Sequence, residues 1–582
     1  MVQRRMSSST TPSLDPFTAE IIREGLLAIA EEMFASMGRT SKSPIIYEVL
    51  DYACALTTAD AQLISQANGV TGFLGTLTYA VQDILNKFGD DMAPGDIFAT
   101  NDPYNGGGSH LSDVSMVMPI FVDGELVAFA VNKAHWSEIG GKDAGSWTTD
   151  ATEIYQEGLQ LPGVRLFRQG KPEQGVLDII AANVRTPDMT LGDLHAQAAC
   201  LRLAALRTQE LCRKYGLEAV REAIRLMLDH GERMARQALA RLPKGVFEAE
   251  DFIDDDGIGD EPRRVRVRVT ITDEEFIADF TGSAPQSRGP VNCSRVALMS
   301  GVRAIFLALT NPGLPANEGF FRPLKVICPD GTVFTVQRPA PVSTHWEARL
   351  FATELVWKAL APAVPERLTA GHYLSVCAQV VVTTRPGTDQ LALLVEPNAG
   401  GWGAGFDKDG EDGLYCVGDG ETYVLPAEVA EAAYNVRVNR YAYHIVDAGE
   451  GRFRGGRGMV REYIITSDEG AIATASFGRH KFRPWGVAGG RDGSPNYVQV
   501  VRADGREEPP VGKIARVRLA KGDMLRLVTG TGGGWGDPRE RPRVLVQADL
   551  RAGMISVQSA RDVYGLSEEE IAQALGGKSH AD

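Results

Sequence analysis

The spacing of apolar residues divides the first quarter of the chain into helices and strands. Residues 15–37 carry apolar side chains at helical intervals, and Asp15 can cap the helix that they predict. Residues 77–88 repeat the helical pattern. Residues 114–136 form two apolar runs around an Asp-Gly pair at 123–124, which predicts a β-hairpin.

The pattern changes twice further along the chain. Residues 191–242 predict long amphipathic helices, and residues 246–283 then alternate with period two, which is typical of antiparallel sheet. Two more helices are predicted over 295–310 and 353–368. Beyond residue 370, strands are expected to alternate with Gly-rich turns up to the C-terminus.

These segments indicate an α+β, multidomain protein with a mixed α/β N-terminal part and a β-rich C-terminal half. A chain of 582 residues is too long for one simple core, and about two to four domains are expected. We expect a disordered tail over 1–14, a domain with long helices over 15–242, a mixed β/α domain over 243–370 and a β-rich domain with glycine loops over 371–582.

Composition excludes several classes of partner. The formal net charge is -15, which argues against nucleic acid, because phosphates require a basic surface. No stretch approaches about 20 uninterrupted apolar residues, so no membrane span is expected. The seven cysteines are scattered without a C-x-x-C pair, which is typical of reduced thiols in the cytoplasm.

Two histidines and an aspartate could form a metal site. The run NDPYNGGGSHLSDV (101–114) places His110 three residues before Asp113, after a glycine loop, and His135 ends the second strand of the predicted hairpin. Paired strands can bring all three together, with Asp51 as a fourth ligand from a neighbouring strand. Such sets suit Zn, Mn or Fe. Polar loop residues, or core histidines with satisfied hydrogen bonds, fit the same spacing.

Other polar residues near this segment are weaker candidates. Glu138 and Glu157 could act as general acid or base, or could support the metal ligands. Solvated loop carboxylates explain each of them equally simply. Asp102 and Asp193 are subject to the same alternative, and Asp102 is expected to cap a turn before Pro103.

The sequence offers no convincing nucleotide site or nucleophile. The glycine-rich runs 399–405 and 529–538 do not match G-x-x-x-x-G-K-[ST], and we expect them to pack tightly rather than bind phosphate. No G-x-S-x-G motif stands out. Cys293, in the loop GPVNCS, is expected to be buried and structural. We therefore expect no ATP site in this chain.

The motifs together resemble a known family. NDPYNGGGSHLSDV, AHW-x3-GG-x3-GSW, IYQEGLQLP and N-x-R-x-P-x4-GDL-x-AQ resemble the B-type chains of ATP-dependent hydantoinases. That family also includes the second half of 5-oxoprolinases and the α-type chains of acetone and acetophenone carboxylases. The match continues in order through GPVNCS, RPAPVS, GRHKFRPWGVAGG and GTGGGWGDPRERP, and thus covers nearly the whole chain.

The resemblance implies a metal and a partner. In the family, a divalent metal (Zn or Mn) is held at the positions of Asp51, His110, Asp113 and His135. A separate A-type hydantoinase/oxoprolinase subunit, of the actin-like kinase type, holds ATP. ATP then phosphorylates an amide or enolate oxygen, and the metal site directs water or a carboxyl donor onto the activated carbon.

One departure concerns the substrate. Hydantoinase-type members commonly have a histidine where this chain has Phe73, and Trp136 and Trp147 make the neighbourhood more aromatic. An aromatic pocket would accept a bulky cyclic amide or an aryl ketone. We expect ATP-dependent hydrolysis of a hydantoin or lactam first, carboxylation of a ketone second, and a non-catalytic scaffold around a structural metal third.

Overall fold

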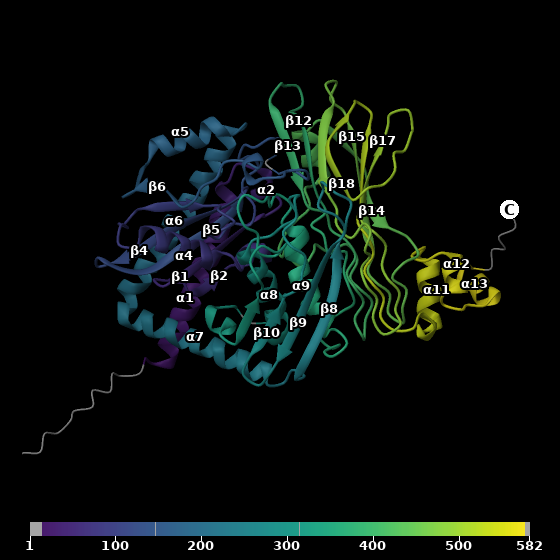
Figure 1. The fold of residues 1–582 in the computed structure, drawn as a ribbon, viewed down its shortest axis with the longest axis horizontal. Helices are drawn as coiled ribbons and strands as arrows, with labels where there is room; N and C mark the ends of the chain where they lie inside the picture. Colours follow the sequence, from purple (N-terminus) through teal and green to yellow (C-terminus); the bar gives the residue numbers. More distant parts are fainter. Residues whose placement is uncertain (1–13, 146, 314, 577–582) are drawn as a thin grey trace, which may run out of the picture.

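The computed structural model describes residues 14–145, 147–313 and 315–576, and Figure 1 shows three packed parts followed by a small helical unit. The predicted tail lies almost wholly outside the described residues. The N-terminal part, the central part and the C-terminal sheets follow one another along the long axis of the molecule (Figure 1). The α+β, multidomain prediction is confirmed.

The N-terminal part is built on one antiparallel sheet with the strand order β2-β1-β5-β4-β3-β6-β7. The predicted hairpin is confirmed, and Asp123 and Gly124 adopt φ of 50° and 84° at its turn. The strands are β1 (Tyr52–Thr58), β2 (Leu63–Gln66), β3 (Ile97–Thr100), β4 (Asp113–Val122), β5 (Glu125–His135), β6 (Val164–Arg168) and β7 (Lys171–Pro172).

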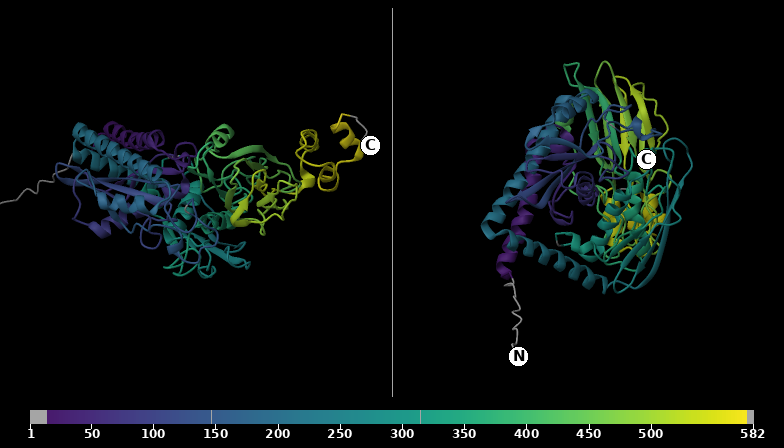
Figure 2. Two further views of the ribbon diagram at one scale, coloured as in Figure 1. Left: turned by 90° about the horizontal axis from the view of Figure 1, so that it is seen from above. Right: turned by 60° about the vertical axis from the view of Figure 1, so that its left-hand side comes forward.

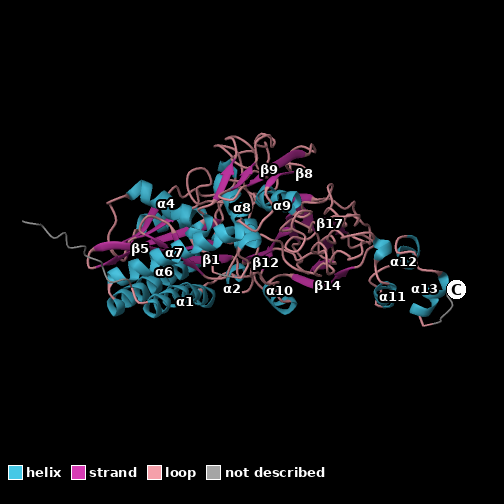
Figure 3. Cartoon of the chain, turned by 90° about the horizontal axis from the view of Figure 1, so that it is seen from below, coloured by secondary structure: helices cyan, strands magenta, loops and turns pink. Residues whose placement is uncertain are grey.

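Helices cover both faces of this sheet. Cys54 and Leu56 of β1 pack into a core with α1, α6 and α7, whereas Ala53 and Ala55 belong to the core that contains α4. Alternate strand residues point to opposite faces, so both faces are apolar. Figure 3 shows α1, α6 and α7 side by side. The helices are α1 (Pro16–Thr40), α2 (Pro44–Tyr47), α3 (Thr71–Leu74), α4 (Leu77–Phe88), α5 (Gln174–Asn183), α6 (Pro187–Tyr215) and α7 (Leu217–Leu239).

The central part pairs a four-stranded sheet with two helices. The strand order is β11-β10-β9-β8, formed by β8 (Gly245–Ile253), β9 (Arg263–Ile271), β10 (Phe276–Asp279) and β11 (Leu324–Ile327). The predicted helix over 295–310 is α8 (Arg295–Thr310). The prediction for 353–368 was wrong at both ends, because α9 spans Trp346–Leu360. Its first twelve residues are all buried, so no polar face marks its start in the sequence.

The C-terminal half contains two four-stranded sheets. One has the order β13-β12-β16-β18 and the other β14-β15-β19-β17. Their strands are β12 (Ala378–Thr384), β13 (Leu391–Glu396), β14 (Val436–His444), β15 (Gly458–Ile465), β16 (Ala471–Ser476), β17 (Tyr497–Val501), β18 (Lys513–Leu519) and β19 (Met524–Val528), and α10 (Ala427–Ala433) lies beside β14.

The glycine runs pack backbone against backbone, as expected from the sequence. The amide of Gly401 donates to the carbonyl oxygen of Gly530 at 3.0 Å. A Cβ added at Gly403 would lie 1.8 Å from the Ala370 oxygen, and one at Gly532 would lie 2.0 Å from the Trp402 oxygen. These glycines are required because no side chain fits between the crossing segments.

The chain ends in helices that the sequence reading missed. The helices α11 (Arg543–Arg551), α12 (Val557–Asp562) and α13 (Glu568–Ala574) form a unit with its own apolar core at one end of the molecule (Figure 2). A signal was present, since Ser567 and Glu570 form a capping box at α13. No helix in the described ranges is long and apolar enough to cross a membrane.

Candidate metal centre

Three adjacent strands bring three of the predicted ligands to one edge of the N-terminal sheet. Asp113 begins β4 and is paired directly with His135 at the end of β5. On the other side of β5, Tyr52 pairs with Ala134, so Asp51 lies next to His135. The His135 amide donates to the Asp51 carbonyl oxygen at 3.1 Å. Strand register alone therefore explains this juxtaposition.

His110 joins the cluster through the turn before β4. Its Nε2 lies 2.9 Å from Asp113 Oδ1, and His135 Nδ1 lies 3.2 Å from the same oxygen. Ser109 donates its hydroxyl to the other oxygen of Asp113. All three residues are buried, and the rings of His110 and His135 are 5.1 Å apart between centroids.

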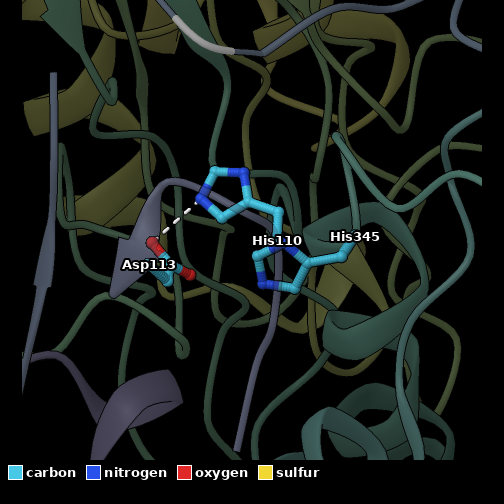
Figure 4. A group of neighbouring side chains, drawn as sticks. All are labelled: His110, Asp113 and His345. Atoms are coloured by element: carbon cyan, nitrogen blue, oxygen red, sulfur yellow. Dashed lines mark hydrogen bonds and ion pairs between the residues drawn. The ribbon is translucent and has the colours of Figure 1, made fainter. Parts of the chain in front are cut away.

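A third histidine completes the cluster from a distant part of the chain. His345 precedes α9, and its ring centroid lies 4.9 Å from that of His110 (Figure 4). Donor atoms of His110, Asp113 and His345 all lie within 4.8 Å of one another. The sequence reading missed His345, although it lies two residues after the RPAPVS motif, because α9 was expected to begin later.

The donor set fits a divalent cation. His110 Nδ1 can only donate to the carbonyl oxygen of Ser343, 3.1 Å away, so a neutral His110 directs the lone pair of Nε2 at Asp113. A lone pair facing a carboxylate needs a proton or a metal ion between them. His135 Nε2 and His345 Nδ1 are buried without a hydrogen-bond partner. Imidazole and carboxylate donors of this kind suit Zn, Mn or Fe.

Electrostatics keep the donor atoms in forms that can bind a cation. Burial acts to raise the pKa of Asp113, but the adjacent His110 and His135 hold that pKa well below its usual range. Burial, together with the charge of His110, lowers the pKa of His345 well below its usual range. Burial also raises the pKa of Asp51 to about 7. His345 is therefore neutral at pH 7, and its lone pair is free.

The cluster lines a cavity of about 70 Å³ between the three parts of the fold. Phe73, Trp147 and Trp346 give it aromatic walls, and the two indole rings meet edge to face at 5.3 Å. The C-terminal half contributes residues of β12 and β13 and the segment around Asp419. Burial raises the pKa of Asp419 to about 6. The aromatic character expected from the sequence is thus present, although Trp136 does not line this cavity and bonds to Gln197 instead.

The two predicted glutamates lie beside the cavity rather than in its walls. Glu138 accepts hydrogen bonds from the amides of Gly140 and Gly145 and from Arg185, and so organises the loop after β5. Glu157 accepts the amides of Val342 and Ser343 through one oxygen. Burial raises the pKa of Glu157 to about 8. These bonds favour supporting roles for both residues.

The remaining candidates have structural partners. Asp102 accepts the amide of Tyr104 at 3.0 Å, as expected for a turn cap. Asp193 accepts the amides of Lys42 and Ser43. Cys293 is buried, and burial raises its thiol pKa.

The fold and this site define an α+β protein that encloses a candidate metal centre between its parts. The chain belongs to the hydantoinase B/oxoprolinase family, whose sequence model matches residues 15–538. The resemblance read from the motifs is therefore confirmed.

Individual relatives agree with this assignment. The B-type chain of a putative D-/L-hydantoinase from Pseudomonas sp. (strain NS671) is 32% identical over 578 residues, which cover 96% of each chain. The crystal structure of ATP-dependent caprolactamase from Pseudomonas jessenii matches with a TM-score of 0.89 at 29% identity, over 96% of this chain and 97% of that one. An acetone carboxylase structure, at 19% identity, shares the fold with a TM-score of 0.88 over 96% of this chain and 82% of that one.

Proposed function

We propose that this chain is the metal-containing B-type subunit of an ATP-dependent complex that hydrolyses a cyclic amide, a hydantoin or a lactam. The observation that carries the proposal is the buried cluster of His110, Asp113 and His135, with ring nitrogens that lack protein partners. The names of two relatives, a putative hydantoinase and a caprolactamase, support the substrate class.

The proposed ligands are Asp51, His110, Asp113 and His135, with His345 next to them. A Zn or Mn ion there would supply Lewis-acid polarisation and lower the pKa of a bound water. His345, neutral at pH 7, can accept a proton at Nδ1 from a nucleophilic water in the cavity. Glu157 holds the segment whose Ser343 carbonyl fixes the ring of His110, and Glu138 shapes the neighbouring loop.

ATP would be bound by an A-type partner subunit in the cytoplasm. The glycine runs that most resemble nucleotide loops are filled by crossing backbone, which leaves no room for phosphate there. Two relatives, of the hydantoinase and of the caprolactamase, are each named as one subunit of their enzyme, which supports a division of labour between chains. In this scheme the partner activates the amide oxygen with ATP, and the enclosed cavity excludes bulk water while the activated carbon is attacked.

The test is turnover by the reconstituted complex. The chain is co-expressed with the A-type subunit encoded beside it, and ADP release is followed with hydantoin, 5-oxoproline and caprolactam, and separately with acetone and acetophenone plus bicarbonate. We expect ring opening of a cyclic amide without bicarbonate, loss of activity in Asp113→Asn, and full activity in the surface control His195→Gln. Turnover of a ketone only when bicarbonate is present would replace hydrolysis with carboxylation.

The scaffold alternative is separated by the same kind of variant. If His110→Ala and His135→Ala complexes assemble, lose the metal and keep full turnover, catalysis does not take place at this centre. A purified, folded chain without stoichiometric divalent metal would remove the proposal that the chain is a metal-containing subunit.

A further inference from the structure

An arginine lies in the wall of the same cavity. Arg349 is one helical turn after His345, so both side chains lie on the same face of α9. Only 6% of Arg349 is exposed, and it lines the cavity together with the candidate metal ligands. The sequence reading did not single out this residue.

Two glycines from distant segments hold the guanidinium group in place. A Cβ added at Gly72 would lie 2.2 Å from Nη1 of Arg349, and one at Gly418 would lie 2.4 Å from Nη2. The amide of Gly72 donates to the Gly418 carbonyl oxygen at 2.9 Å, which joins the two segments. Neither glycine has a positive φ, so the absence of a side chain serves the space that the guanidinium occupies.

The guanidinium has no protein anion to pair with. Within the part of the chain that the structure describes, no side chain forms an ion pair or a hydrogen bond with it, and its Nε is buried without a partner. Asp51 and Asp419 also line the cavity, and the Arg349 charge acts to lower the pKa of both, but neither forms an ion pair with it. A buried charge without a partner is costly, so a ligand that pairs with it binds strongly.

We propose that Arg349 forms a binding site for a small oxyanion, a carboxylate, bicarbonate or phosphate group, beside the metal centre. Arginine presents its N–H groups in a planar fork that matches the oxygens of these anions. The cavity of about 70 Å³ limits the bound group to a small one. This inference rests on the proposed function, in which Arg349 holds the anionic group of the activated substrate or of the carbon donor while the candidate metal ligands face the reacting carbon.

The test is equilibrium binding to the purified chain, which needs neither the partner chain nor turnover. Inorganic phosphate, acetate and bicarbonate are titrated separately by calorimetry into metal-loaded protein and into protein stripped with a chelator. We expect at least one of these anions to bind, and its affinity to fall by about 10- to 100-fold in Arg349→Gln. The anion that binds most tightly identifies the source of the oxyanion.

Two further variants separate anion binding from folding. Arg349→Lys keeps the charge but loses the fork, and we expect a weaker loss than in Arg349→Gln. Gly72→Ala leaves Arg349 intact but places a methyl group against Nη1, so it should weaken the same anion. The control Arg295→Gln removes an exposed arginine of α8 and should leave binding unchanged. Metal content should stay at the wild-type level in all four.

The result has two clear negatives. If no oxyanion binds the wild-type chain, or if Arg349→Lys and Gly72→Ala bind it as tightly as wild type, Arg349 is not an anion site. Anion binding that persists in chelator-stripped protein supports Arg349 even if the metal proposal fails, so the two proposals can fail independently.

Discussion

His110 and Ser343 are 233 residues apart in sequence, yet the ring of His110 donates from Nδ1 to the Ser343 carbonyl oxygen at 3.1 Å. This bond fixes which ring nitrogen of His110 faces Asp113. The backbone that orients a candidate metal ligand on the N-terminal sheet therefore belongs to the central part of the chain. The same short segment continues into His345 and Arg349, so it carries three features of the site.

Removing a histidine from the cluster should weaken metal binding. We expect His110→Ala and His135→Ala to lower the affinity for Zn or Mn by at least about 100-fold, and His345→Ala by about 10- to 100-fold. Metal content after dialysis against a chelator, measured by atomic emission, checks this. His195→Gln, on the exposed face of α6, serves as control. Equal metal retention in His110→Ala and the control would count against the proposed ligand set.

The buried carboxyl of Glu157 should make stability depend on pH. Its pKa is raised from about 4.5 to about 8, so the folded chain keeps a proton that the unfolded chain releases between these values. The wild type therefore loses stability as pH rises through this window, by at most about 1.4 kcal/mol per pH unit. Glu157→Gln should lack this decline.

Urea unfolding at several pH values measures the effect. The difference in free energy of unfolding between Glu157→Gln and wild type should grow in favour of the variant from pH 5 to pH 8. The matched control Glu153→Gln changes an exposed glutamate nearby and should track the wild type. Parallel curves for Glu157→Gln and wild type would show that the carboxyl is already ionised in the folded protein.

The crossing glycine loops should not tolerate a methyl group. Gly403→Ala would place Cβ 1.8 Å from the Ala370 oxygen, and we expect a loss of about 3 kcal/mol or more in the free energy of unfolding. Gly175→Ala, in α5 with open space around it, should instead stabilise by up to about 1 kcal/mol. Denaturant unfolding of both variants tests the pair, and a neutral Gly403→Ala would contradict the packing argument.

A buried arginine joins the C-terminal half to the central part. Arg479 donates to both oxygens of Asp251 at 3.0 Å and lies 3.4 Å from Glu354. Arg479→Gln would leave buried carboxylates without their partner, and we expect a loss of about 3–5 kcal/mol. Arg268→Gln removes an exposed ion pair with Glu248 and should change the midpoint of thermal unfolding only slightly. Similar midpoints for both variants would show that the Arg479 network adds little.

Local patterns predicted the part of the site that depends on neighbouring strands. The turn at residues 123–124 set the hairpin, and its register places His135 opposite Asp113, as the sequence indicated. The position of Asp51 next to His135 follows from the antiparallel pairing of β1 with β5.

The rest of the site could not be predicted by the same means. The helix α9 is buried on all sides in its first turns, so its start left no alternation of polar and apolar residues to detect. His345 and Arg349 were lost with that start. Periodicity also says nothing about which distant segment covers a sheet edge, and the cavity wall around Asp419 comes from such a segment.

The cavity is closed by segments that are synthesised at very different times. Asp51, His110, Asp113 and His135 leave the ribosome early, whereas the wall around Asp419 follows only when most of the chain has been made. During translation the strand edge with its histidines therefore faces solvent, and a metal ion can reach it freely. Once β12 and β13 dock, the entrance shuts, and exchange of the ion becomes limited by opening of the folded protein.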